Sequence, residues 1–136
     1  MSEPIVREAR CVCGDLRIRL KGEPMLVSSC CCTRCQRRTG ALFGVTVYFH
    51  PDQAIAREGT WSTFHLPDGS TTFHFCPRCG SNVWWVPDEE KDVFGVAGGC
   101  FADPTLPSPK RMVHTRNKHP YVRPPDGIPL YEDAPE

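Results

Sequence analysis

The chain has 136 residues, the size of one ordinary domain, and its 16 lysines and arginines balance its 16 aspartates and glutamates. This balance gives no reason to expect nucleic acid or an anionic membrane as the main partner. The N-terminal residues lack the apolar core of a signal peptide, and the longest apolar run, near residues 41–49, is too short to span a bilayer. We therefore expect a single domain over residues 1–136 in the cytoplasm, with no nucleic-acid and no membrane partner.

Short strands separated by turns dominate the pattern along the chain. The first, residues 15–20, alternates polar and apolar side chains, which is typical of a half-buried strand. Similar stretches predict further strands at residues 45–49, 61–66, 71–75, 83–86, 93–101 and 111–115. The turn residues 67–70 lie between two of these runs, so we expect a hairpin in which Gly69 has a positive φ.

Helix is expected to be scarce. No segment shows a sustained apolar period of 3.6 residues, and 14 prolines interrupt the chain. One short helix is expected around residues 33–39. The proline-rich C-terminal segment, about residues 121–136, is interpreted as a wrap over the sheet with a frayed end, anchored by Tyr121, Ile128, Leu130 and Tyr131. The expected fold class is therefore all-β.

Eight of the nine cysteines fall into three groups, which are Cys11 with Cys13, then Cys30, Cys31, Cys32 and Cys35, and finally Cys76 with Cys79. An odd number of cysteines in a reducing compartment argues against a disulfide framework. Close thiol pairs followed by a glycine, as at Gly14 and Gly80, are typical of metal-binding turns that close with a positive φ. We interpret the groups as metal ligands, with zinc as the first choice and iron as an alternative.

The cysteine spacing leaves two ligand sets open, because structural zinc takes four ligands. In the first set, the N-terminal pair and the Cys76 pair close one site, and the middle group forms a three-thiolate site with an open fourth position. In the second set, Cys76 and Cys79 join two thiols of the middle group, and the N-terminal pair stays free or binds weakly. Purely structural metal throughout is a further alternative, and a redox role for the Cys76 pair is a minor one.

The ordered cysteine motifs resemble those of the glutathione-dependent formaldehyde-activating enzyme family, which also includes centromere-protein-V-type domains. The motifs are CVCG at 11–14, the CxCxxC pattern at 30–35 followed by basic residues and TG, and FCPRCGS at 75–81. The similarity extends to GCFADP at 99–104 and to residues 112–119. The chain departs from the family pattern at Cys31, where histidine is usual, and near residues 119–121, where tryptophan is usual.

The resemblance implies a tent-like fold of antiparallel sheets stapled by zinc, with two zinc ions per chain. It selects the first ligand set, in which a structural zinc is bound by Cys11, Cys13, Cys76 and Cys79, and a catalytic zinc, held less tightly, by Cys30, Cys32 and Cys35. The implied activity is that of a zinc-dependent carbon–sulfur lyase or synthase acting on a thiol–aldehyde adduct such as S-hydroxymethylglutathione. The alternative, from another class, is a noncatalytic zinc-stapled β-domain that binds a protein partner.

Three arginines lie beside the middle cysteine group. Glutathione has two carboxylates, and guanidinium groups bind carboxylates in a bidentate manner. Arg34, Arg37 and Arg38 are therefore candidates for contacts with the carboxylates of the thiol substrate. The alternative is that they form a solvated helix face or pair with surface acids.

Cys31 lies between two proposed ligands. If Cys30 and Cys32 bind one ion, the side chain between them points away from the metal, so Cys31 is not expected to be a ligand. We expect it to fill a small apolar pocket, as free cysteines often do. The alternative is a thiol of lowered pKa that forms mixed disulfides.

Overall fold

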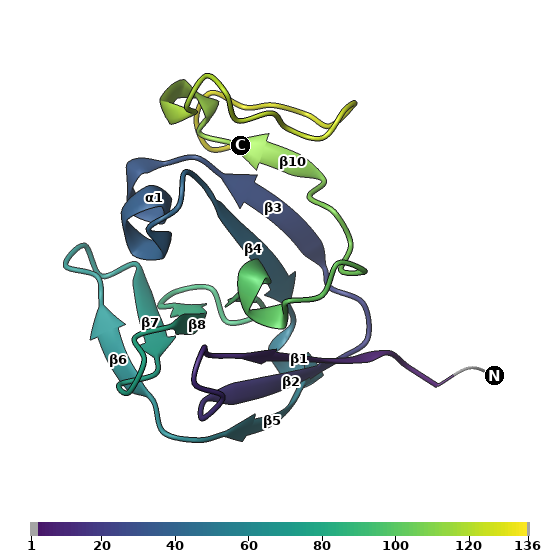
Figure 1. Cartoon of the computed structure of the whole chain (residues 1–136), viewed down its shortest axis with the longest axis vertical. Coiled ribbons are helices and arrows are strands. Elements are labelled where there is room, and N and C mark those ends of the chain that lie inside the picture. Colours follow the sequence, from purple (N-terminus) through teal and green to yellow (C-terminus); the bar gives the residue numbers. More distant parts are fainter. Residues whose placement is uncertain (1–2, 136) are drawn as a thin grey trace.

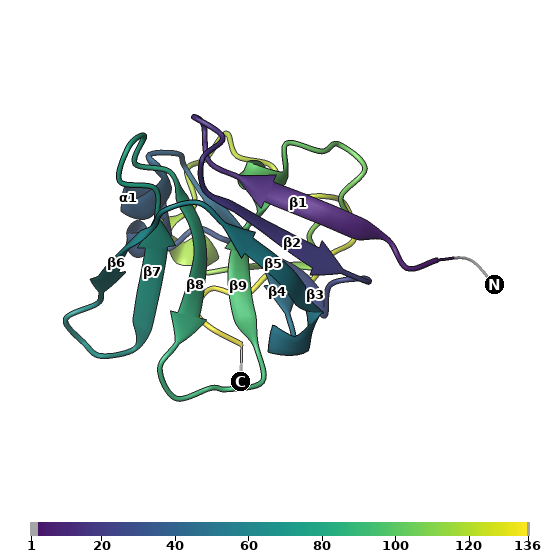
Figure 2. The same ribbon diagram turned by 90° about the horizontal axis from the view of Figure 1, so that it is seen from below.

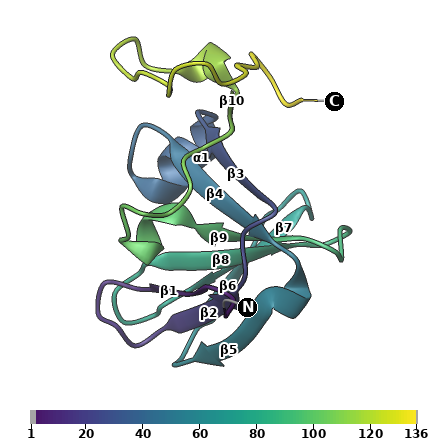
Figure 3. The ribbon, with the colours of Figure 1, turned by 90° about the vertical axis from the view of Figure 1, so that its right-hand side faces the viewer.

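The computed structural model describes residues 3–135, which form ten short strands in two sheets and one α-helix (Figure 1). The smaller sheet has the order β1-β2-β5 and is antiparallel throughout. Its strands are β1 (Val6–Arg10), β2 (Arg17–Lys21) and β5 (Ala54–Glu58). It lies at one end of the molecule, and the C-terminal segment lies at the other (Figure 3).

The larger sheet has seven strands in the order β10-β3-β4-β9-β8-β7-β6. They are β3 (Leu26–Cys30), β4 (Gly44–Phe49), β6 (Ser62–His65), β7 (Thr71–Phe75), β8 (Asn82–Pro87), β9 (Phe94–Ala97) and β10 (Arg111–Val113). Figure 2 shows β6, β7, β8 and β9 side by side. Neighbouring strands are antiparallel except β10, which pairs with β3 in parallel, so the expectation of purely antiparallel sheets needs this one correction.

Helical structure is limited to short pieces in the described residues. The α-helix α1 (Thr33–Thr39) ends at Gly40, whose φ of 69° is left-handed. Three 3₁₀ turns complete the set, namely η1 (Pro51–Gln53), η2 (Gly98–Phe101) and η3 (Thr115–Asn117). The expected all-β class is thus confirmed. Within residues 3–135, no helix combines the length and the apolar character needed to cross a membrane.

The main core joins the two sheets. Leu16, Ile18 and Leu20 are fully buried, because the alternation of this segment turns all three toward the larger sheet. They belong to one cluster with Phe49 and Trp84 of the larger sheet. Burial of each such side chain contributes about 1.5–3 kcal/mol, so the alternating segment is a principal contact between the sheets.

Three further predictions from the sequence concern a helix, a turn and a strand. The helix at 33–39 is confirmed, and so is the 67–70 turn, in which Gly69 has a φ of 77°. The single strand expected over 93–101 is wrong in its second half, because the chain leaves β9 after Ala97 and turns into η2. Two successive glycines begin that turn, and glycine is unfavourable within strands.

A second, smaller cluster anchors the C-terminal segment. Cys31, Met112 and Val122 are buried together, and Ile128 packs against them. Of the four expected anchors, only Ile128 belongs to this cluster. Tyr121 is 72% exposed and is not an anchor. The side chains of Leu130 and Tyr131 are also exposed, and these two residues contact β10 and η3 through their backbone instead. Proline-rich chain satisfies few backbone hydrogen bonds by itself, and this segment is instead held by backbone contacts to β10 and η3.

Candidate metal centres and thiol cavity

Four cysteine sulfurs meet where the turn after β1 approaches the turn after β7. The Cys11 Sγ lies 3.5 Å from the Cys13 Sγ, which lies 3.6 Å from the Cys76 Sγ. Together with the Cys79 Sγ, all lie within 4.8 Å of one another. Zinc bonds of about 2.3 Å in a tetrahedron place sulfurs roughly 3.8 Å apart. The four side chains therefore fit a tetrahedral metal ion that would join the two sheets.

Backbone and hydroxyl donors surround this four-cysteine cluster. The Leu16 amide donates to the Cys11 Sγ at 3.2 Å, and the Val12 amide donates to the Ser81 Oγ at 3.1 Å. The Ser81 hydroxyl lies 3.3 Å from the Cys79 Sγ and, together with the backbone amides of Cys13 and Ser81, lowers the pKa of Cys79 to about 5. Gly14 and Gly80 have φ values of 83° and 81°, as expected for turns that close around a metal. The Cys13 thiol differs from that of Cys79, because the Asp15 amide lowers its pKa but the neighbouring thiols, Cys11 first, raise it to about 12. Metal binding would displace its proton.

The second cluster forms where β3 ends and α1 begins. Cys30 is the last residue of β3, Cys32 caps α1, and Cys35 lies in the first turn of the helix. The Cys32 Sγ accepts a hydrogen bond from the Cys35 amide at 3.3 Å. The three sulfurs lie within 4.8 Å of one another, and within residues 3–135 no fourth histidine, cysteine or carboxylate joins them. The cluster suits a metal ion with one position left for another ligand.

The thiols of this three-cysteine cluster share protons unequally. The hydrogen bond from the Cys30 thiol, with that of Cys32 and the charge of Arg38, lowers the pKa of Cys35 to about 5. The same hydrogen bond to Cys35, followed by burial, raises the pKa of Cys30 far above its ordinary range. Cys35 is therefore the first thiolate of the metal-free cluster, and metal binding would displace the remaining protons.

A cavity of about 260 Å³ opens beside the three-cysteine cluster. Residues from distant parts of the sequence form its walls with the three cysteines, including Arg34, Arg38, Tyr48, Trp85, Arg111 and His114. Arg111 is held by a hydrogen bond from its Nε to the Ser28 Oγ at 3.0 Å. Sequence reasoning missed Tyr48, Trp85, Arg111 and His114, because only the pairing of β10 with β3 and the order of the larger sheet bring them to the cysteines. A neighbouring hollow of about 520 Å³ shares Tyr48 and Arg111 but contains no cysteine.

The three arginines expected at the site differ in position. Arg38 donates to the Asn82 Oδ1 at 3.0 Å and lines the cavity. Arg34 also lines it, and its Nη2 forms a 2.9 Å ion pair with Asp68. Arg37 is exposed and is not part of the cavity wall. Two guanidinium groups of the predicted set, together with that of Arg111, therefore give the cavity a positive wall.

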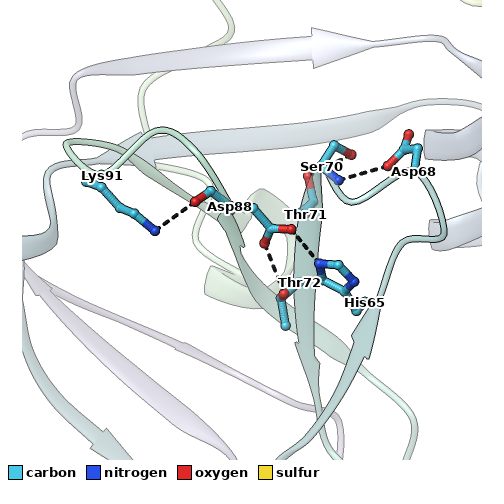
Figure 4. Close-up of polar contacts among 7 residues, drawn as sticks. All are labelled: His65, Asp68, Ser70, Thr71, Thr72, Asp88 and Lys91. Carbon is cyan, nitrogen blue, oxygen red and sulfur yellow. Dashed lines mark hydrogen bonds and ion pairs between the residues drawn. The ribbon is translucent and has the colours of Figure 1, made fainter.

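The hairpin of β6 and β7 forms another wall and is held by a polar network (Figure 4). The Asp88 carboxylate contacts the His65 Nε2 and accepts a hydrogen bond from the Thr72 hydroxyl at 3.3 Å. At the tip, the Asp68 Oδ1 accepts from the Ser70 amide at 2.9 Å. Because Asp68 also pairs with Arg34, the tip of the hairpin is tied to α1 beside the cavity.

Cys31 points away from its neighbours into the small apolar cluster. Its side chain is fully buried beside Met112 and Val122, as expected for a cysteine that fills an apolar pocket. Burial raises the pKa of the Cys31 thiol. The alternative of a thiol with lowered pKa is therefore wrong, because the apolar surroundings disfavour the thiolate.

Comparisons with known proteins were consistent with this architecture. A family model described as glutathione-dependent formaldehyde-activating enzyme matches residues 6–117. No curated protein matches the chain. Among solved structures, the crystal structure of a Rhodobacter sphaeroides protein is similar, with a TM-score of 0.53 and 18% identity, covering 90% of this chain and 98% of that chain. At this identity, the similarity shows a shared fold alone.

Proposed function

The chain belongs to the glutathione-dependent formaldehyde-activating enzyme family, and from this premise we propose that it is a zinc-dependent carbon–sulfur lyase or synthase. The substrate class is a thiol–aldehyde adduct, such as S-hydroxymethylglutathione. In the synthase direction, the thiol sulfur bonds to the aldehyde carbon, the carbonyl becomes a hydroxyl, and the thiol proton ends on that oxygen. The lyase direction reverses these changes. We place the activity in the cytoplasm, where thiols stay reduced.

One observation carries the proposal: three cysteine sulfurs within 4.8 Å of one another line a cavity that guanidinium groups also line. A purely structural site needs neither an adjoining cavity nor a positive wall. We assign Cys30, Cys32 and Cys35 as ligands of the catalytic zinc. Cys11, Cys13, Cys76 and Cys79 are assigned to the structural zinc.

The chemistry divides between the metal and the protein side chains. Zinc bound at the three-cysteine cluster would favour the thiolate form of a substrate thiol at neutral pH. We assign Arg38 and Arg111 to substrate carboxylates; in support, each lines the cavity and each is held by a hydrogen bond to a neighbouring side chain. Their charges would orient a carboxylate-bearing thiol with its sulfur toward the cysteines.

Exchange NMR tests the proposal. The interconversion of formaldehyde and glutathione with their adduct is measured without protein, with the zinc-loaded protein and with Cys35→Ser. We expect acceleration by the wild-type protein and none by Cys35→Ser. Cys100→Ser is the matched control, because Cys100 belongs to neither cluster, and it should retain the wild-type rate. A wild-type protein no faster than Cys35→Ser would favour the noncatalytic, partner-binding domain.

A further inference from the structure

The C-terminal residues 129–135, here called the strap, run alongside β10 and η3 (Figures 1 and 3). The Met112 amide donates to the Pro129 carbonyl at 3.0 Å, and the Tyr131 amide donates to the Met112 carbonyl at 2.9 Å. Farther along, the His114 amide donates to the Asp133 carbonyl at 3.3 Å. The strap thus continues beyond the edge of the larger sheet and reaches the residue that follows β10.

Charged side chains hold the strap in this position. The Arg116 Nη2 lies 3.1 Å from the Asp133 Oδ2 and 3.3 Å from the Glu132 Oε2. These groups are exposed, so solvent screens the ion pairs and each stabilises the strap only weakly. The side chains of Leu130 and Tyr131, the two large apolar residues of the strap, are exposed. The strap is therefore attached by backbone hydrogen bonds to β10 and η3 and by exposed ion pairs, and none of its side chains is buried. Segments with few buried apolar contacts open locally at lower cost than the core.

The end of the strap forms part of the wall of the thiol cavity. Ala134 and Pro135 line the cavity together with His114 and the three cysteines. The cavity measures about 260 Å³ with the strap in place. This volume lies below the roughly 300–1,000 Å³ of sites for drug-sized ligands, so a thiol of tripeptide size would fill the cavity up to the strap. The strap also lies outside residues 6–117, the part of the chain that the family model matches.

We propose that the strap determines which thiols reach the three-cysteine cluster, by closing one side of the cavity against bulky thiols. A small thiol enters with the strap closed, whereas a thiol of tripeptide size needs the strap to open. This inference deepens the proposed function and rests on it for the identity of the ligand as a thiol. Access past the strap depends only on the protein wall of the cavity, so it can be measured without any catalysed reaction.

The test compares two thiol reagents of different size. Alkylation of Cys35 is followed by peptide mass spectrometry, with N-ethylmaleimide as the small reagent and fluorescein-5-maleimide as the bulky one. The full-length protein is treated with a mild chelator so that no metal protects the cluster, and circular dichroism verifies the fold. Free glutathione gives the intrinsic rate ratio of the two reagents. In the wild-type protein, the bulky reagent should be slower at Cys35 than this ratio predicts.

Releasing the strap should remove this size dependence. Arg116→Ala should raise the rate with the bulky reagent by about fivefold at most, because the strap loses its ion pairs, while the rate with N-ethylmaleimide changes less than about twofold. Asp133→Asn weakens the same contact from the strap side and should act in the same direction. Arg123→Ala is the matched control, because Arg123 is an exposed C-terminal cation without an ion pair in the described part of the chain.

Equal gains with both reagents would indicate general loosening around β10 and would overturn the inference. An unchanged rate with the bulky reagent in both Arg116→Ala and Asp133→Asn would overturn it as well. A size-dependent gain in these variants, combined with no acceleration in the exchange experiment, would instead reject the proposed catalysis and retain the strap as a barrier.

Discussion

The guanidinium of Arg38 lies over the ring of Trp85, with its Cζ 4.2 Å from the centre of the ring. Such a cation–π contact contributes about 0.5–2 kcal/mol, depending on desolvation. The hydrogen bond from Arg38 to Asn82 fixes the same group from another side. A long side chain with two such supports is held in one orientation, so Arg38 presents a defined charge to the cavity three residues after Cys35.

Arg38 should matter most for thiols that carry carboxylates. Arg38→Lys keeps the positive charge but loses the planar bidentate geometry and the stacking on Trp85. We expect kcat/KM for glutathione to fall at least about tenfold and that for 2-mercaptoethanol, which has no carboxylate, to fall much less. Steady-state rates with the two thiols provide the measurement. An equal loss for both would show that Arg38 acts on the fold or the cluster instead of the carboxylate.

Removing one sulfur from the four-cysteine cluster should destabilise the whole fold. Cys76 is fully buried at the junction of the two sheets, and Cys76→Ser would leave three thiols for the metal. Because metal binding contributes directly to folding free energy, we expect a loss of several kcal/mol in urea unfolding. Cys100→Ser, which alters a half-buried thiol outside both clusters, should cost less than about 1 kcal/mol. A Cys76→Ser protein with normal stability and full zinc content would mean that the ligand set is wrong.

The two clusters should release metal in sequence. A site with three protein ligands holds zinc less tightly than a site with four, so a mild chelator should remove one zinc per chain first. The protein should remain folded at that stage and lose its activity. Zinc content and circular dichroism, recorded over the same chelator titration, test this order. Unfolding that accompanies loss of the first zinc would contradict it.

The three adjacent cysteines at 30–32 should differ in their effect on zinc binding, because their side chains point in different directions. Cys31→Ala removes a buried thiol from the apolar cluster with Met112 and should cost about 1 kcal/mol of stability while keeping both zinc ions. Cys30→Ala and Cys32→Ala should each lose the second zinc. Measurement of the zinc content per chain in the three variants tests this prediction. Loss of zinc in Cys31→Ala, with retention in either neighbour, would shift the ligand set by one residue.

Local sequence signals predicted some elements and missed others for physical reasons. The alternation that buries Leu16, Ile18 and Leu20 is visible within six residues, and so are the turn at Gly69 and the short helix. Strands β1, β3 and β5 were not predicted. In β3, Val27, Ser28 and Ser29 are all buried, so both faces of the strand are covered. A serine lies on each face beside apolar residues, and no period of two appears.

The candidate site was likewise predicted only in part. Its cysteines are recognisable because close spacing is a local property, and the family resemblance supplied the grouping. The positive and aromatic walls depend instead on long-range pairing: Val113 pairs with Cys30, and this register carries Arg111 and His114 to the cavity. No local sequence pattern near Arg111 or His114 indicates that this segment pairs with a strand about 80 residues away. The position of the strap could not be predicted from the sequence either, because its contacts are backbone hydrogen bonds and exposed charges.

Cobalt substitution tests the central claim most directly, namely that the three-cysteine cluster holds a metal ion with a position open to a thiol. Cobalt is loaded into both clusters, and the visible absorption of the ion is followed while glutathione or 2-mercaptoethanol is added. We expect a saturable spectral change in the wild-type protein, and its absence in Cys35→Ser, with the absorption of the four-cysteine cluster unchanged in both proteins. A wild-type spectrum that stays constant at saturating concentrations of both thiols would contradict the claim.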